Sequence, residues 1–229
     1  MGSINYCVPI LGYILSGVVG YFLGSIPTGY LVASARGIDI RTVGSGNIGA
    51  TNVFCYLGVP AGIFVLIADA FKGWFAVFIA TNLFWVWFHS TGGAQAREWS
   101  AITAGLFAIL GHNFTCWLHF KGGKGIATSA GVLLALVPAS LLIILTVWVI
   151  IFVLTRFVSL ASICAAVALP LASWLTGQSS TIICITGVMS ALAIYKHRAN
   201  IQRLLKGTEN RIGGKKSRSS DARPPGAAS

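Results

Sequence analysis

Three short segments of the chain are rich in residue types that bind anions: glycine, lysine, serine, asparagine and histidine. They read GIDIRTVGSGNIGATN at 37–52, HFKGGKGIATS at 119–129 and YKHRANI at 195–201. Glycines let backbone N–H groups converge on a phosphate, and hydroxyl, amide and ammonium groups add further donors. The residue types in these segments therefore predict a phosphate-binding site.

The first segment is expected to supply both backbone and side-chain donors. Gly44, Gly46 and Gly49 permit the turns in which successive N–H groups form a concave anion nest. The side chains expected to join them are those of Arg41, Ser45, Asn47, Thr51 and Asn52. The glycine spacing also matches the dinucleotide-binding pattern GxGxxG, but no strand–helix alternation surrounds it, so that interpretation is rejected. A flexible membrane loop is the simpler alternative.

The second segment places two lysines around a glycine pair at the start of an apolar run. Gly122 and Gly123 would let an anion approach the backbone, while Lys121 and Lys124 supply positive charge. The spacing differs from that of a Walker A loop. The alternative is a plain basic loop beside the membrane, which explains Lys121 better than the deeper Lys124.

The third segment contributes His197 and Asn200, which are three residues apart and so share one face of a helix. The histidine could donate to an anion or exchange a proton near neutral pH. An interfacial histidine among basic residues is an equally good interpretation of the sequence.

Two further polar groups fall inside apolar runs. Asp69 and Lys72 are three residues apart, and we expect them to form a buried ion pair. His112 lies near the end of another run, and we expect it to make an interhelical hydrogen bond rather than act as a general base.

Several catalytic patterns are absent from the sequence. It contains no H-x4-D pair, no GxSxG nucleophile elbow and no carboxylate cluster that would hold a divalent metal ion. Its five cysteines form no CxxC pair. The sequence thus predicts neither a metal nor a cofactor, and it favours phosphate binding over chemistry by a strong protein base.

The composition indicates what holds these segments in place. Of the 229 residues, 55% are hydrophobic and only 9% are charged, and the mean hydropathy is +0.80. Soluble proteins carry about 25% charged residues, so a water-facing globular domain is excluded. The chain is predicted to be an all-α integral membrane protein.

The net charge of +11 is concentrated at the end of the chain, where nine basic residues from Lys196 onward face two acidic ones. After membrane spans, such a tail indicates contact with membrane lipids rather than with nucleic acid. We expect residues 1–207 to form a single transmembrane domain and residues 208–229 a basic, disordered cytoplasmic tail.

The apolar runs predict about seven transmembrane helices, with the N-terminus outside and the C-terminus in the cytoplasm. The runs are 1–35, 57–87, 99–118, 125–155 and 157–195. Each of the last two is expected to cross twice, turning near Pro138 and near Gly177. A five-span arrangement with Arg156 outside is the alternative. On the seven-span topology, all three polar segments lie on one side of the membrane.

Three motifs in this order carry a resemblance to a known family. GSGNIGATN at 44–52, GHNF…FKGGKGIAT at 111–128 and YKHRANIQRLLKGTEN at 195–210 resemble the PlsY family of acyl-phosphate:glycerol-3-phosphate acyltransferases. The resemblance extends over most of the chain. It implies a multi-pass enzyme of the bacterial inner membrane, with seven helices and no metal.

The resemblance also implies the reaction and the site. A fatty acyl group would pass from acyl phosphate to the 1-hydroxyl of glycerol 3-phosphate, giving lysophosphatidic acid and phosphate, as the first acylation step of phospholipid biosynthesis. Ser45, Lys124, His197 and Asn200 would line the polar pocket, with the substrate phosphate assisting in place of a protein base. The phosphotransacylase that forms acyl phosphate would be a partner. A membrane transporter or channel for a phosphorylated anion is the alternative function.

The sequence departs from the family pattern at two positions. The arginine that usually follows the first motif is Cys55 here, and the proline that usually follows GHNF is Thr115. A thiol offers no bidentate contact to phosphate. Either another cation such as Arg36 or Arg41 takes over, or the affinity for glycerol 3-phosphate is reduced.

Overall fold

The structure is a computed structural model that describes residues 7–84 and 93–213, and every regular element in these ranges is helical. The α-helices are α1 (Cys7–Ser25), α2 (Thr28–Ser34), α3 (Ala50–Leu57), α4 (Val59–Ile79), α6 (Gly93–Asn113), α7 (Ile126–Leu136), α8 (Pro138–Thr155), α9 (Val158–Leu175), α10 (Ser180–Lys196) and α11 (Arg198–Leu205). A π-helical turn, η1 (Ala80–Phe84), extends α4, and a 3-10 turn, η2 (Cys116–Leu118), follows α6. The all-α prediction is confirmed.

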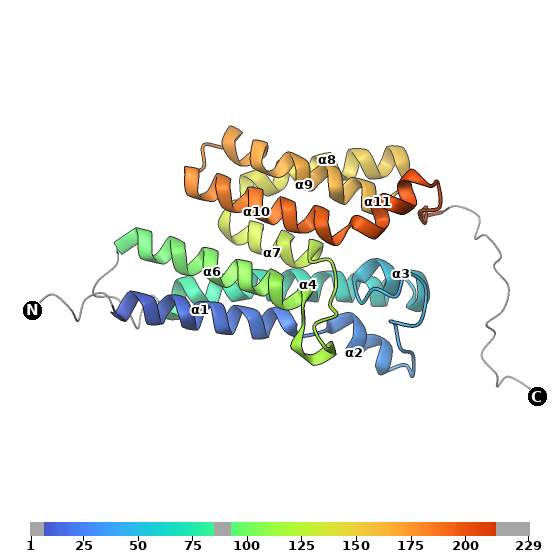
Figure 1. Cartoon of the computed structure of the whole chain (residues 1–229), viewed down its shortest axis with the longest axis horizontal. Helices are drawn as coiled ribbons and strands as arrows, with labels where there is room; N and C mark the ends of the chain where they lie inside the picture. The colour runs from blue at the N-terminus through green and yellow to red at the C-terminus, as the bar shows by residue number, and fades with distance from the viewer. Residues whose placement is uncertain (1–6, 85–92, 214–229) are drawn as a thin grey trace, which may run out of the picture.

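The long helices form two layers with α7 between them (Figure 1). Helices α8, α9 and α10 make one layer, and α1, α4 and α6 make the other. One apolar core joins the layers, and it includes Ile102, Val132, Leu169 and Met189 from α6, α7, α9 and α10. The opposite faces expose large apolar side chains such as Leu142, Val153 and Leu154, as expected for contact with lipid.

Small residues allow α1 to pack closely against α6, and α7 against α4. A Cβ at Gly24 would overlap the backbone of Ala108, which brings α1 and α6 together. A Cβ at Gly131 would overlap the backbone of Ala70, which brings α7 and α4 together. Close backbone contact through small residues is typical of helices that associate in a membrane.

Within residues 7–84 and 93–213, five helical segments are long and apolar enough to cross a membrane, and a sixth is formed if α10 and α11, bent by 57°, count as one span. Helix α7 has only 11 residues and so rises about 16 Å, roughly half the hydrocarbon thickness. The run 125–155 does form two helices, which break at Val137 just before Pro138. The number of crossings and their orientation stay predictions.

The predicted ion pair inside the bundle is confirmed. Lys72 Nζ lies 2.8 Å from a carboxylate oxygen of Asp69, and it also donates a 2.8 Å hydrogen bond to the Ile26 carbonyl, where α1 gives way to α2. His112 Nδ1 lies 3.7 Å from the Asp69 carboxylate, too far for the interhelical hydrogen bond that we expected.

The residues that directly follow Gly207 make contacts with the helices, and the domain boundary at Gly207 stays a prediction. Residues 208–213 pack against the turn between α8 and α9. Ile212 N–H donates a 3.0 Å hydrogen bond to the Arg156 carbonyl, and Arg211 Nε donates one of 3.2 Å to the Thr155 carbonyl. The Glu209 carboxylate also fixes this segment, since it accepts hydrogen bonds from Ser159, Asn200 and Arg203. The remaining residues of the expected tail lie outside the described ranges.

Candidate active site

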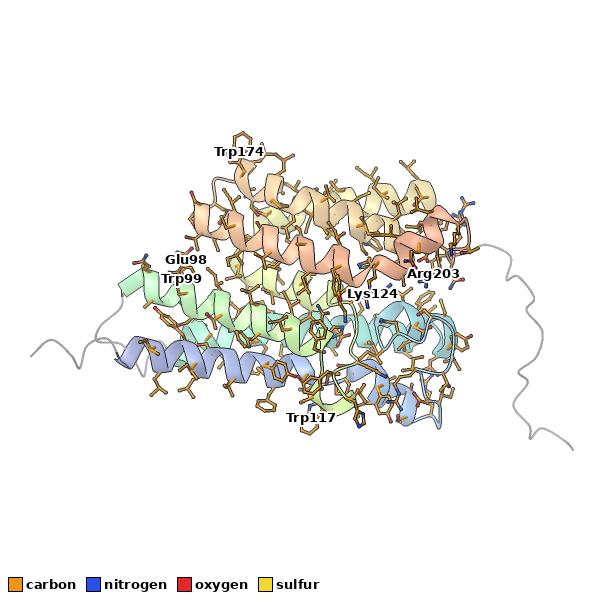
Figure 2. The ribbon with its side chains drawn as sticks, in the orientation of Figure 1. Glu98, Trp99, Trp117, Lys124, Trp174 and Arg203 are labelled. Carbon is orange, nitrogen blue, oxygen red and sulfur yellow. The ribbon has the colours of Figure 1, made fainter. Side chains whose placement is uncertain are left out.

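The three polar segments lie toward the same end of the bundle, away from the start of α1 (Figure 1). Figure 2 shows Lys124 and Arg203 toward this end and Glu98 and Trp99 at the other. A buried cluster joins the first two segments, since Leu118 packs with Ile40, Ile48 and Val53. The three segments therefore converge toward one end of the bundle, and the side of the membrane on which they lie stays a prediction.

Asn52 organises the first segment from within. Its side-chain amide donates hydrogen bonds of 3.1, 3.0 and 2.9 Å to the carbonyls of Ile40, Val43 and Asn47. Its oxygen accepts a 3.1 Å hydrogen bond from the Ser45 N–H. Asn52 is buried, so it supports the loop and does not offer the free donor that we predicted.

The expected nest of backbone N–H groups is also used internally. Besides Ser45 N–H, Gly46 N–H donates to the Val43 carbonyl at 3.0 Å, and Gly49 N–H donates to the Asn47 side chain at 2.9 Å. Gly44 and Gly46 do adopt the positive φ values that favour glycine, 60° and 66°. Three backbone N–H groups of the loop are therefore used within it, and the exposed side chains of Ser45 and Thr51 face solvent.

Arg41 is already paired. Its guanidinium lies 2.7 Å from the Asp39 carboxylate, and a side-chain hydrogen bond from Arg41 lowers the pKa of Asp39 to about 2. Both side chains are exposed, so the pair is solvated and an anion would have to compete with Asp39 for this cation.

In the second segment only one of the two lysines is withdrawn from solvent. Lys121 is exposed, whereas Lys124 is half-buried just before α7. Burial lowers the pKa of Lys124 to about 8; the Glu209 carboxylate opposes this effect and Arg203 reinforces it. A half-desolvated ammonium interacts strongly with an anion and changes its charge near physiological pH.

The third segment contains a buried histidine at the bend between α10 and α11. His197 is 2% exposed, and its Nδ1 donates a 2.8 Å hydrogen bond to the Ala193 carbonyl, since a carbonyl can only accept. Nε2 is then the ring nitrogen left for a substrate. Asn200, predicted to bind substrate, instead donates a 2.6 Å hydrogen bond to Glu209.

Reasoning from the sequence missed Glu209. Its carboxylate also accepts hydrogen bonds of 2.7 Å from the Ser159 hydroxyl and 2.7 Å from Arg203 Nε. Burial alone would raise its pKa, but the hydrogen bonds from these two residues and Asn200 lower it below its ordinary value. The available signal was a lone acid, Glu209, among the basic residues just after α11, because a carboxylate beside basic residues can form ion pairs with them.

The two departures from the family pattern have separate structural settings. Cys55 is exposed on α3, and Arg36 reaches the last turn of the same helix with a 3.0 Å hydrogen bond to the Leu57 carbonyl. Arg36 is therefore a better candidate than Arg41 for a replacement cation. Thr115 uses its buried hydroxyl to donate a 2.6 Å hydrogen bond to the Ser25 carbonyl, which ties α1 to the turn after α6.

These features define a helical integral membrane protein with basic and polar side chains gathered toward one end of an apolar bundle. Residues 14–207 match the family described as glycerol-3-phosphate acyltransferase. A protein of that name from Geotalea daltonii is 49% identical over 191 residues, which cover 83% of this chain and 92% of the relative. One from Endomicrobium trichonymphae is 46% identical over 196 residues, which cover 85% and 93%.

Two solved structures are similar over nearly their whole length. Both are crystal structures of PlsY (YgiH), an integral membrane glycerol 3-phosphate acyltransferase. The glycerol 3-phosphate form has a TM-score of 0.79 at 39% identity and covers 88% of this chain and 96% of that one. The lysophosphatidic acid form has a TM-score of 0.76 at 38% identity and covers 87% and 94%. The chain belongs to the glycerol-3-phosphate acyltransferase family.

Proposed function

We propose that this protein transfers a fatty acyl group to the 1-hydroxyl of glycerol 3-phosphate, giving lysophosphatidic acid. The observation that carries the proposal is the half-buried Lys124 ammonium, which lies close enough to His197 for its charge to act on the imidazole, at the polar end of an apolar bundle. A long acyl chain is kept among apolar helices while its reactive headgroup meets a cation. Membership of the acyltransferase family supports the same reaction.

The donor that fits this site is acyl phosphate. The hydroxyl oxygen attacks the acyl carbon, the bond from that carbon to the phosphate oxygen breaks, and the hydroxyl proton leaves with the phosphate. Because acyl phosphate is already activated, binding and orientation can supply much of the rate. Lys124 would stabilise the negative charge that develops on the leaving phosphate, as preorganised cations do.

The other polar residues of the site have supporting roles in this proposal. Ser45, exposed on its loop, and His197, through Nε2, would bind substrate oxygens. Gly122 and Gly123 shape the loop that carries Lys124. The donor would come from a phosphotransacylase, and the protein would lie in the bacterial inner membrane with residues 1–207 as its catalytic domain.

The purified protein in detergent tests this function. With palmitoyl phosphate as donor, phosphate release should require glycerol 3-phosphate, and mass spectrometry should detect one equivalent of 1-acyl-glycerol 3-phosphate. Lys124→Ala should lower the rate about 100- to 1,000-fold, whereas Lys121→Ala, at an exposed position of the same loop, should retain most of it. Transport of glycerol 3-phosphate into sealed vesicles without acyl product would contradict the proposal and support the transporter.

A further inference from the structure

The loop that carries Lys124 rests on the last two residues of α6. Gly123 N–H donates a 3.0 Å hydrogen bond to the His112 carbonyl, and Gly122 N–H donates one of 3.2 Å to the Asn113 carbonyl. Lys196 Nζ donates to the same Asn113 carbonyl at 2.9 Å. The position of the Lys124 backbone is thus set by the end of α6.

Three glycines in this loop lie against that end of α6, each against a different group. A Cβ at Gly122 would overlap the backbone carbonyl of His112, and one at Gly123 would overlap the imidazole Nε2 of His112. Gly125 has φ 80° and faces the side chain of Asn113. Contacts with the protein itself therefore account for glycine at these positions, without the close approach of an anion that the sequence suggested.

The other side of the His112 imidazole faces Asp69. The ring is buried, and Nδ1 lies 3.7 Å from the Asp69 carboxylate on α4. Asp69 is paired with Lys72, which binds the Ile26 carbonyl between α1 and α2. A continuous set of contacts thus runs from the α1–α2 junction through α4 and α6 to the loop.

We propose that His112 is a positioning residue for acyl transfer: its imidazole fills the space over Gly123 and fixes the loop that presents Lys124. This inference rests on the proposed function, because Lys124 is the group that it positions. A displacement of about 1 Å at a catalytic group can reduce the rate about 100-fold. The side chain under Gly123 therefore controls the reaction without touching a substrate.

A double-mutant cycle between positions 123 and 112 tests the proposal. Gly123→Ala should lower kcat/KM for glycerol 3-phosphate about 100-fold, since the new methyl group displaces the loop from His112. His112→Ala should lower it about tenfold by removing the support. The double variant should be more active than Gly123→Ala alone, because the shortened side chain makes room for the methyl group.

A matched control separates the imidazole from the backbone. Gly122→Ala meets the His112 carbonyl, which is still present in His112→Ala, so the second substitution should not rescue it. If the double variant at 123 and 112 is no more active than Gly123→Ala, Gly123 serves another purpose and the proposal is overturned. If Gly123→Ala does not fold, recovery of folded protein in the double variant supports the proposal, and failure to recover it contradicts the proposal.

A measurement that does not depend on activity distinguishes this inference from the proposed function. Acetic anhydride labelling of Lys124, quantified by mass spectrometry against the exposed Lys121 in the same peptide, reports the environment of its amine. Labelling of Lys124 should increase in Gly123→Ala and fall back in the double variant. Unchanged labelling in all variants would overturn the positioning role even if acyl transfer is confirmed. The expected labelling pattern in an inactive protein would contradict only the proposed function.

Discussion

The side-chain amide of Asn200 donates a 2.6 Å hydrogen bond to the carboxylate of Glu209. This contact places the turn after α11 against the first turn of α11, which follows His197, and Ser159 from α9 adds a second hydrogen bond to the same carboxylate. The buried carboxylate therefore joins three parts of the C-terminal half, and Asn200 belongs to the framework of the site.

Replacing Glu209 should destabilise this half of the protein. Glu209→Ala leaves buried donors without a partner, and each costs about 1–3 kcal/mol. Glu209→Gln keeps an acceptor oxygen and should cost less. Thermal unfolding in detergent measures both. The pKa of Glu209 in the folded protein lies below its ordinary value. The ionised carboxylate therefore stabilises the fold at pH values above the ordinary pKa, and this stabilisation is lost as the pH falls through the folded pKa. Equal stability of wild type and Glu209→Ala at neutral pH would contradict this account.

Lys124 should give the reaction an alkaline limit. With a pKa of about 8, its ammonium is charged below that pH and neutral above it, so activity should fall as the pH rises through about 8. Lys124→Arg keeps the charge at all accessible pH values, so its residual activity should lose this limit. Lys124→Ala should reduce kcat about 100- to 1,000-fold at neutral pH. If the activity of Lys124→Arg keeps the same alkaline limit, the limit arises from another titratable group.

Cys55→Arg should strengthen the binding of glycerol 3-phosphate. A guanidinium on the exposed face of α3 adds a bidentate partner for phosphate, and we expect KM for glycerol 3-phosphate to fall about tenfold, the effect of about 1.4 kcal/mol. KM for acyl phosphate should stay the same. In the enzyme that keeps Cys55, Arg36→Gln should weaken the binding of glycerol 3-phosphate if Arg36 has taken over this role. An unchanged KM for glycerol 3-phosphate would exclude Arg36.

The ion pair between Asp69 and Lys72 should contribute to stability as a unit. Removal of one charge leaves the other buried without its partner, at a cost of about 3–5 kcal/mol, so Asp69→Asn and Lys72→Met should each lower the unfolding temperature strongly. The double variant should be more stable than either single variant. Additive losses would show that the two side chains act independently.

The sequence predicted the parts of this structure that follow from local rules. The spacing of Asp69 and Lys72 predicts their pairing because residues three apart share a helix face. The distribution of charge along the chain likewise predicted that the three polar segments converge. The role of Asn52 was not accessible in this way. An asparagine in a glycine-rich loop can bind a ligand or its own backbone with equal ease, and only the folded loop decides between them. Glu209 was missed because the composition around it is that of a tail.

The shortness of α7 affects where Lys124 lies. Helix α7 has 11 residues and α8 has 18, so α7 is about 10 Å shorter than α8. Lys124 stands just ahead of α7 and is half-buried. On the proposed function, an acyl donor would react with its chain still dissolved in the bilayer, while the small, water-soluble acceptor would reach it from the polar end of the bundle. The protein would then act as a phase-transfer catalyst, which brings a hydrophilic reactant to a lipid-bound one.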